Sequence, residues 1–370
     1  MPANRNQLCQ KIRIIELESL FDFNNEIINL IEGKQIGGIA VQMYFWAKIF
    51  AQNGWQVFSF KENAKHTEEK EAVVFKPQKS VQSINALLEW WYAFYYLLRI
   101  RPDVVIYRGA NRALFPLSVF SKLFGVKLVM FGASDVNFEP GKELVGSKFN
   151  RKCYQKAIKR IRLFVTQNKH QHDTLLNNYD KESITLFNIW GEVVQEPDKM
   201  VPSSDAVWVA NFRKLKRAEW VIEAAKQCPE YRFAMAGGGF DEYYKEMQTQ
   251  AQCVVNLDFL GPKSFFFTNS LVQQSKVLLC TSTFEGFPNT FLQAWSNGIP
   301  VISTVDPSNI IDDNNIGVII VKEEDLPEAI RKVLEDKEYY KKLQNSIVKF
   351  FNKNHSSQSG YDKLMKYIYG

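Results

Sequence analysis

The residues best suited to chemistry lie in segment 281–300, Thr-Ser-Thr-Phe-Glu-Gly-Phe-Pro-Asn-Thr-Phe-Leu-Gln-Ala-Trp-Ser-Asn-Gly-Ile-Pro. The apolar run 276–280 predicts a buried strand before it, so the segment should form a loop and then a short helix. Pro288 suits the first helical residue and Gly298 a left-handed helix end. The amides of Asn289, Thr290 and Phe291 would then be unpaired donors of the first helical turn, which favours binding of an anion such as phosphate.

An acidic side chain, Glu285, stands beside this helix start, and Gln293 follows about two helical turns later. A carboxylate accepts hydrogen bonds from hydroxyl groups, whereas the amides would hold a phosphate. The combination indicates a ligand that carries both phosphate and hydroxyl groups, as a nucleotide sugar does.

A second candidate is the basic loop in segment 207–219, Val-Trp-Val-Ala-Asn-Phe-Arg-Lys-Leu-Lys-Arg-Ala-Glu. Its first residues predict a strand, and the ligands of parallel sheets bind at the carboxyl ends of strands. Arg213 and Lys216 would neutralise a diphosphate as negative charge develops on it. The alternative is a basic loop that is merely solvated.

The run Glu-Gly-Phe-Pro-Asn-Thr-Phe-Leu-Gln-Ala, followed by Gly-Ile-Pro-Val-Ile, resembles the donor-site signature of the retaining GT-B glycosyltransferases of family 4. The likeness extends from Gly37 and Gly38 to about residue 335. It implies transfer of a sugar, with retention, from a nucleoside diphosphate sugar to a hydroxyl of a glycan or lipid-linked acceptor. Such a reaction would serve cell-surface polysaccharide or glycolipid synthesis.

The resemblance implies a role for each candidate residue. Glu285 would bond hydroxyls of the donor sugar, and Gln293 replaces the glutamate that usually binds ribose. The family's phosphate-binding arginine falls five residues before the lysine, where this chain has Asn211, so Arg213 must act in its place. The catalytic residues expected are Glu285, Arg213, Lys216 and Asp135. The donor-binding residues expected are Gly37, Gly38, Gly238, Leu260, Gly261, Gly286, Phe287, Pro288, Asn289, Thr290, Phe291 and Gln293.

Asp135 follows the predicted strand 126–131, at a position where many relatives have a histidine and an acid; this chain has Ser134 and Asp135. Asp135 either binds a sugar hydroxyl or caps the turn that follows. The glycines 237–239 form either a tight turn or a close approach to ligand. Segment 258–262 matches the part of the family that holds the nucleobase through backbone groups. Gly37 and Gly38 match the family's glycine loop, with a simple flexible loop as the alternative.

No metal site is expected. The four histidines and five cysteines show no metal-ligand spacing, and the cysteines are expected to be reduced. The resemblance likewise implies a metal-independent enzyme without a cofactor, for which the nucleoside diphosphate sugar is a substrate.

Alternating strand and helix patterns run along the 370 residues and predict an α/β fold with parallel sheets. The resemblance implies GT-B architecture, in which two doubly wound Rossmann-like domains face each other across a cleft. We expect an N-terminal, acceptor-side domain at 1–190, a linker at 191–204, a nucleotide-sugar domain at 205–355 and a C-terminal helix at 356–370. The resemblance implies that this helix crosses back to the N-terminal domain.

The net charge of +6 is concentrated in one place, because eight lysines and arginines but no acids lie between Leu144 and His172. Residues 147–161 predict an amphipathic helix with a basic face. That face is either simply solvated or binds an anionic membrane surface. The longest apolar run, 86–98, is too short to span a bilayer. We therefore expect a cytoplasmic protein. If the basic face binds lipid, the protein would be peripheral at the inner face of the cell membrane. No nucleic-acid partner is expected.

Two other functions remain open. The departures at Asn211, Ser134 and Gln293 suit a catalytically silent subunit that binds a sugar or a partner protein. The second is a phosphorylase or epimerase of related fold that acts on a sugar nucleotide. It stays open because a fold alone does not determine function.

Overall fold

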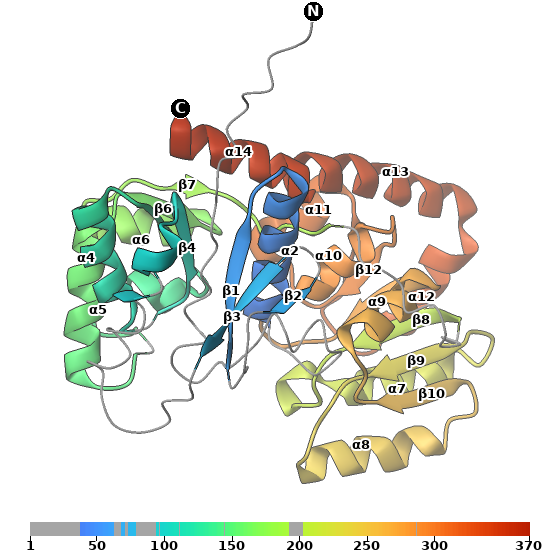
Figure 1. Cartoon of the computed structure of the whole chain (residues 1–370). Helices are drawn as coiled ribbons and strands as arrows, with labels where there is room; N and C mark the ends of the chain where they lie inside the picture. Colours follow the sequence, from blue (N-terminus) through green and yellow to red (C-terminus); the bar gives the residue numbers. More distant parts are fainter. Residues whose placement is uncertain are drawn as a thin grey trace, which may run out of the picture. The chain divides into compact units, whose positions relative to one another are not determined.

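The computed structural model describes residues 38–62, 68–70, 73–78, 94–95, 97–110, 112–143, 145–191, 203–285 and 287–370. Its contacts divide the chain into two compact units (Figure 1). Among the described residues, unit 1 comprises 38–189 and 357–370, and unit 2 comprises 190–356. The C-terminal helix therefore belongs to unit 1. Most of segment 191–204, the predicted linker, lies outside the described residues.

Unit 1 contains a sheet of four parallel strands in the order β4-β5-β6-β7. These strands span Val104–Arg108, Lys127–Phe131, Leu163–Thr166 and Ile184–Thr185. A second sheet has the order β1-β3-β2, with β1 at Val57–Glu62, β3 at Val73–Gln78 and β2 at Glu68–Lys70. β2 runs antiparallel to β3, which the alternating pattern did not predict. Its Glu-Glu-Lys sequence carries no apolar periodicity that would mark a strand.

The helices of unit 1 pack against these strands. Those whose bounds the structure describes include α2 (Gly38–Gln52), α4 (Leu114–Phe124), α5 (Lys148–Arg160), α6 (Lys169–Tyr179) and α14 (Ser357–Tyr369), with a 3-10 turn, η2, at Asp135–Phe138. α2 is apolar on nearly every side and is almost wholly buried. Its Trp46 ring meets that of Phe131 edge-on, with centroids 5.2 Å apart. Gln42 is also buried, and its side chain exchanges two hydrogen bonds with the backbone of Ile189, at 2.9 and 3.1 Å.

α14 packs on α2 (Figure 1). Trp55, just beyond α2, donates its indole N–H to the Tyr361 hydroxyl at 2.7 Å, and the Tyr361 ring meets that of Phe50 at 5.1 Å. At Gly360 a Cβ would lie 2.4 Å from a methyl group of Ile189, so the helix can approach this closely only with glycine at that position. The final helix is thus an integral part of unit 1.

Unit 2 is built on one parallel sheet of six strands in the order β10-β9-β8-β11-β12-β13. The strands are β8 (Ser204–Val209), β9 (Phe233–Ala236), β10 (Leu257–Gly261), β11 (Ser275–Cys280), β12 (Val301–Ser303) and β13 (Gly317–Ile319). The helices are α7 (Ala218–Gln227), α8 (Glu242–Gln252), α9 (Phe265–Gln273), α10 (Asn289–Trp295), α11 (Ile310–Asn314), α12 (Asp325–Glu335) and α13 (Lys337–Asn354), with 3-10 turns η3 at Lys214–Lys216 and η4 at Pro307–Asn309.

The α/β class predicted from the sequence is confirmed in both units, and the sheet β4-β5-β6-β7 and the sheet of unit 2 are parallel as expected. The sheet β1-β3-β2 is mixed. The central strands of unit 2 are buried along almost their whole length, which explains why they read as continuous apolar runs. The crossover helices lie between strands that pair in parallel, as such connections require.

Candidate functional site

The candidate site lies at the carboxyl edge of the unit 2 sheet. β8 and β11 are direct neighbours in the sheet, although residues 210–274 lie between them in the chain. Because all the strands are parallel, the loops that follow β8 and β11 leave from the same edge. The basic loop and the loop that carries Glu285 are therefore adjacent.

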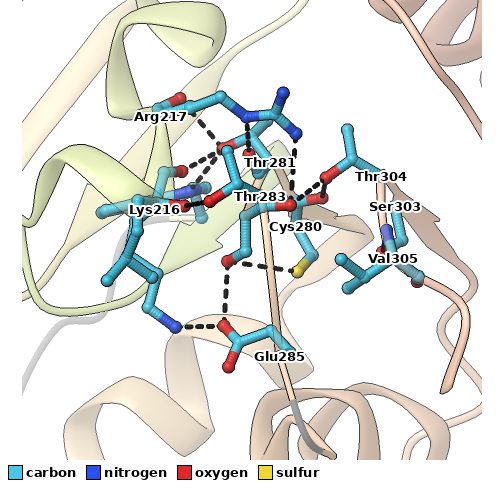
Figure 2. A network of polar contacts seen from close by, with 12 residues as sticks. Lys216, Arg217, Cys280, Thr281, Thr283, Glu285, Ser303, Thr304 and Val305 are labelled. Atoms are coloured by element: carbon cyan, nitrogen blue, oxygen red, sulfur yellow. Dashed lines mark hydrogen bonds and ion pairs between the residues drawn. The ribbon is translucent and has the colours of Figure 1, made fainter.

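Hydrogen bonds between backbone and side chains tie these two loops together (Figure 2). The Arg217 guanidinium donates to the carbonyls of Thr281 and Ser282, at 2.5 and 3.1 Å. In return, the Thr281 hydroxyl donates to the carbonyl of Lys216 at 2.6 Å. Burial lowers the pKa of Arg217 from its ordinary value, yet an arginine remains charged at neutral pH. The two loops thus form one fixed frame.

Within this frame, Lys216 forms an ion pair with Glu285 (Figure 2). The two side chains are 19% and 20% exposed, so the pair is partly shielded but still reachable by a ligand. The Ser282 hydroxyl donates to the same carboxylate oxygen, Oε1 of Glu285, at 2.8 Å. Two of the four residues predicted to be catalytic are therefore in direct contact.

Arg213, the predicted partner of Lys216, occupies a different environment. It precedes the turn η3 and is exposed, as is Lys214. No contact joins the Arg213 side chain to Lys216 or Glu285 among the described residues. Arg213 therefore lies near the ion pair in the chain without taking part in it.

The helix after Glu285 begins one residue later than predicted. Pro288 has ψ of 122°, which is extended backbone, so it caps the helix and Asn289 is the first helical residue. The Phe291 amide donates to the Pro288 carbonyl at 3.1 Å. The prediction that Phe291 offers an unpaired amide is therefore wrong, because a tight first turn uses that donor. Asn289 and Thr290 form the first turn of α10. Gly298, after the helix, has the expected left-handed φ of 68°.

Gln293 lies on the inner side of α10 and is only 3% exposed. Its side-chain amide points to the Thr268 hydroxyl at 3.5 Å. Phe287 is half-buried, and its ring stacks on that of the buried His355 with centroids 5.4 Å apart. The structure thus joins both residues to the body of unit 2. Gly286 lies outside the described residues.

In the glycine run 237–239, close packing explains why two of the three residues are glycine, without any ligand. A Cβ at Gly237 would lie 1.7 Å from the Ala210 carbonyl oxygen, and one at Gly239 would collide with the Tyr244 ring. Gly238, the predicted ligand contact, uses its carbonyl to accept the Phe212 amide at 2.8 Å. The cluster is therefore a close approach of neighbouring strand ends.

At the edge strand β10 the register shifts between Phe259 and Gly261, so Leu260 forms a bulge. A bulge leaves one residue out of the ladder, which makes its backbone groups available to other partners. Gly261 has a left-handed φ of 66°, and its carbonyl accepts the Gly237 amide at 2.9 Å. Leu260 and Gly261 were both predicted to bind through their backbone, and the bulge is compatible with that role.

The remaining predicted residues belong to unit 1. Gly38 is the exposed first residue of α2, whereas Gly37 lies outside the described residues. Asp135 opens the turn η2 after β5 and is partly exposed. Its Oδ1 accepts hydrogen bonds from Asn168 at 3.0 Å and from Gln171 at 3.1 Å.

α5 shows the amphipathic division predicted for residues 147–161. Cys153, Tyr154, Ala157 and Ile158 are buried, and Lys148, Lys152, Lys156, Lys159 and Arg160 are exposed. Phe149 is 61% exposed on the outer face. In the described part of the chain, no helix is long and apolar enough to cross a membrane.

Sequence reasoning missed Ser282, Thr281 and Arg217, which hold the two loops together. The Thr-Ser-Thr run at the end of a strand was an available signal, because hydroxyl side chains there commonly bond neighbouring backbone groups. Within the described ranges, no group of three or more His, Cys, Asp or Glu side chains could hold a metal ion. Burial raises the pKa of the nearby Cys280 thiol, which disfavours the reactive thiolate.

Comparison with known proteins relates this geometry to sugar transfer. Residues 196–349 match the family model described as glycosyl transferases group 1. A segment is 26% identical over 180 residues to the GtfA subunit of the UDP-N-acetylglucosamine–peptide N-acetylglucosaminyltransferase of Streptococcus pneumoniae. That match covers 45% of this chain and 35% of the relative, so the chain spans about a third of the length of that curated protein.

Solved structures match almost the whole chain. Sucrose-phosphate synthase of Thermosynechococcus elongatus has a TM-score of 0.66 and 13% identity, with 96% of this chain and 98% of that one covered. The Anabaena protein HepE, solved with UDP and glucose, has a TM-score of 0.67 and 14% identity, with the same coverage. Similarity at this level shows the fold, which is the GT-B fold of these glycosyltransferases.

Proposed function

We propose that this chain is a metal-independent, retaining glycosyltransferase that moves a hexose-type sugar from a nucleoside diphosphate sugar to a hydroxyl of a glycan or lipid-linked acceptor. The observation that carries the proposal is the contact between Lys216 and Glu285 at the carboxyl edge of β8 and β11. A cation for phosphate and a carboxylate for sugar hydroxyls are thereby held side by side. The match of residues 196–349 to glycosyl transferases group 1 supports the same reading.

In the proposed reaction, the bond between the anomeric carbon and the diphosphate breaks as the acceptor oxygen forms its bond to that carbon. Negative charge then accumulates on the departing diphosphate. Lys216, with the exposed Arg213 nearby and the tip of α10 at Asn289 and Thr290, would stabilise that charge. These groups would do the work that a bound cation does in other enzymes, and no cofactor is required.

Glu285 would accept hydrogen bonds from the donor sugar. Its Oε1 already receives the Ser282 hydroxyl and Lys216, so the carboxylate is held in place before a sugar arrives. A carboxylate fixed in advance loses little conformational freedom on binding, which favours transfer. The proposed acceptor proton would pass to the leaving diphosphate on the same face, consistent with retention.

The donor proposed first is a UDP-hexose, because the Streptococcus relative is named for UDP-N-acetylglucosamine and the Anabaena protein was solved with UDP and glucose. The bulge at Leu260, next to Gly261, is the proposed contact for the base, through backbone groups. Gln293 is a weaker candidate for the ribose contact, because only 3% of its surface is exposed.

A peripheral membrane location forms part of the proposal. The basic stripe of α5, here meaning Lys148, Lys152, Lys156, Lys159 and Arg160, is exposed and includes no acid. Phe149 adds an exposed aromatic ring on the same helix. Basic residues attract anionic lipid headgroups and an exposed ring can enter the interface, so this helix suits a cytoplasmic membrane surface and a lipid-linked acceptor.

Turnover with a panel of donors tests the proposed activity. Purified protein is incubated with UDP-glucose or UDP-N-acetylglucosamine, with and without glycan or lipid-linked acceptors, and UDP release and product are measured. We expect UDP release that depends on acceptor, and NMR of the product should show the anomeric configuration of the donor. Nucleotide binding without turnover would indicate a silent subunit, and conversion without acceptor would indicate an epimerase or hydrolase; either result contradicts the proposal.

A further inference from the structure

Arg217 adopts a backbone conformation that is uncommon for a residue with a side chain. Its φ of 47° and ψ of 55° lie in the left-handed region, at the junction where η3 ends and α7 begins. In that region Cβ comes too close to the backbone, so a residue other than glycine occupies it only where other contacts hold it. The side chain of Arg217 must therefore make contacts that outweigh this cost.

Those contacts hold the guanidinium on its face and on its edge. Its face lies over the indole ring of Trp220 in α7, 3.9 Å from the ring centroid. Its edge donates to the carbonyls of Thr281 and Ser282, at 2.5 and 3.1 Å (Figure 2). A planar guanidinium offers two donors in one fixed geometry, which the single ammonium of a lysine cannot do. One side chain thus joins the loop after β8 to two consecutive residues after β11.

The charge of Arg217 is balanced within unit 2. Burial lowers the pKa of its guanidinium, and the nearby carboxylates of Glu219 and Glu323 act in the opposite direction. Within the described ranges, no hydrogen bond or ion pair joins Arg217 to Glu285. The donors of Arg217 serve backbone carbonyls, so this side chain is placed to hold a loop and not to bind a phosphate.

The loop after β11 passes this constraint on to Glu285. Ser282 is 3% exposed, and its carbonyl accepts both the Arg217 guanidinium and the Thr304 hydroxyl, the latter at 2.6 Å. The Ser282 hydroxyl donates to Oε1 of Glu285 at 2.8 Å. The backbone of Ser282 is thus fixed from two sides while its side chain holds the carboxylate. A shift of Ser282 must therefore move Glu285.

Lys216 depends less on this guanidinium. Its carbonyl accepts the Thr281 hydroxyl at 2.6 Å, and the carbonyl of Leu215 accepts the Thr283 amide at 2.8 Å. Both bonds join the loop of Lys216 to the loop after β11 without the side chain of Arg217. Loss of the guanidinium should therefore displace Glu285 while Lys216 keeps its place.

We propose that Arg217 is a positioning residue for sugar transfer, which acts through Ser282 to hold the carboxylate of Glu285 in the geometry that the reaction needs. The inference rests on the proposed glycosyltransferase function and adds to it a residue that does not touch the donor. Every contact in the argument lies within unit 2. A displacement of about 1 Å at a group that orients the substrate can lower a rate roughly 100-fold, so an indirect contact of this kind affects the reaction.

The test compares wild type with Arg217→Lys in the full chain. Lysine keeps the positive charge but cannot donate to both carbonyls. With UDP-glucose or UDP-N-acetylglucosamine, and the acceptor that supports wild-type turnover, we expect kcat to fall about 10- to 100-fold. The dissociation constant of UDP, measured by calorimetry, should stay nearly unchanged because Lys216 remains in place. A general collapse of the two loops would instead weaken UDP binding in parallel with transfer.

The backbone conformation supplies a second comparison. Arg217→Gly and Arg217→Ala both remove the guanidinium, but only glycine adopts the left-handed region without strain. The thermal midpoint of Arg217→Gly should therefore exceed that of Arg217→Ala. We expect the two variants to show the same loss of kcat, since transfer depends on the missing donors and not on the stability of the fold.

Arg331→Lys is the matched control. Arg331 also belongs to unit 2, and its guanidinium donates to the Gln227 carbonyl at 2.6 Å and to the Glu230 carboxylate at 2.8 Å. Gln227 is the last residue of α7, so these contacts lie at the opposite end of that helix from Arg217. The control variant should retain the wild-type kcat. An equal loss of kcat in Arg331→Lys would show that any lost guanidinium contact has this effect, and would contradict the inference.

Three further results would overturn the inference. Unchanged kcat in Arg217→Lys would remove Arg217 from the reaction. A UDP dissociation constant that rises as far as kcat falls would make Arg217 a phosphate ligand or a purely structural group. Activity that returns with stability in Arg217→Gly would also indicate a structural role. Each of these results refutes the inference alone when the wild-type chain turns over. A wild-type chain that releases no UDP with any donor and acceptor refutes the proposed function, and the inference fails with it.

Discussion

At the scale of single residues, the ion pair between Lys216 and Glu285 has a consequence for ligand binding. In the absence of ligand, the lysine is engaged with the carboxylate, which also receives the Ser282 hydroxyl. A diphosphate must therefore compete with Glu285 for the lysine. A sugar hydroxyl can replace the lysine at the carboxylate at the same time, so the two parts of a nucleotide sugar would separate the pair together.

The substitution Glu285→Gln should separate the two roles. We expect transfer to fall by a factor of about 10² to 10³, which is typical for loss of one group that stabilises a transition state. Binding of UDP alone should become several-fold tighter, because Lys216 no longer has a carboxylate partner. Steady-state kinetics and calorimetric titration with UDP measure the two effects; unchanged turnover would exclude Glu285 from the site.

The basic loop offers a comparison within one short segment. Lys216→Ala should weaken UDP binding most, because Lys216 is part of the fixed frame, and Arg213→Ala should weaken it less, because that side chain is exposed without a contact to the pair. Lys214→Ala is the control and should have the smallest effect. Dissociation constants that rise equally in all three variants would indicate a diffuse basic loop and refute the assignment.

At the scale of secondary-structure elements, the backbone segments that follow β8 and β9 pack closely against each other beside the candidate site. Gly237 lies where a Cβ would be 1.7 Å from the Ala210 carbonyl. Gly237→Ala should therefore lower the free energy of unfolding by about 1–3 kcal/mol, the usual range for overpacking. Gly125→Ala is the control, because a Cβ there meets no atom within 4 Å and only its positive φ of 68° is strained. Denaturant titration of both variants measures the difference; a smaller loss at Gly237 than at Gly125 would contradict the packing argument.

Element positions explain which parts of the site could be predicted. Apolar runs, together with the prolines and glycines that end them, predict β8, β11 and the loops that follow. Lys216 and Glu285 could therefore be predicted as site residues from the sequence. The adjacency of β8 and β11 follows from strand order, which alternation alone does not determine. The helix start at Asn289 was missed by one residue because Pro288 is equally suited to the cap and to the first turn. Asn168 and Gln171 were not predicted, because they read as an ordinary start of an amphipathic helix.

At the scale of the whole molecule, the basic stripe of α5 gives a testable location. Each lysine or arginine near an anionic surface adds about 1 kcal/mol of attraction, which salt screens. Changing Lys152, Lys156 and Lys159 to glutamate should abolish sedimentation with phosphatidylserine-containing vesicles and leave transfer to a short soluble acceptor nearly intact. All three side chains are exposed.

The matched control for this experiment reverses three exposed lysines elsewhere, Lys337, Lys341 and Lys342 of α13. It changes the net charge by the same amount but leaves the stripe of α5 in place, so vesicle binding should persist. Equal loss of binding in both triple variants would indicate attraction by net charge alone. If the wild-type protein never sediments with anionic vesicles at low salt, the basic stripe of α5 is simply a solvent-exposed face and the membrane proposal is refuted.

The central claim is that the frame around Lys216 and Glu285 binds a nucleoside diphosphate, and thermal unfolding tests it without knowledge of the acceptor. A ligand that binds only the folded chain stabilises it by about 2.7 kcal/mol at 100 times its dissociation constant. We therefore expect UDP, or another nucleoside diphosphate of a small panel, to raise the midpoint of the wild-type chain by several degrees, and Lys216→Ala to lose most of that rise. A wild-type midpoint that no nucleoside diphosphate raises, or a rise that is the same in Lys216→Ala, would contradict the account.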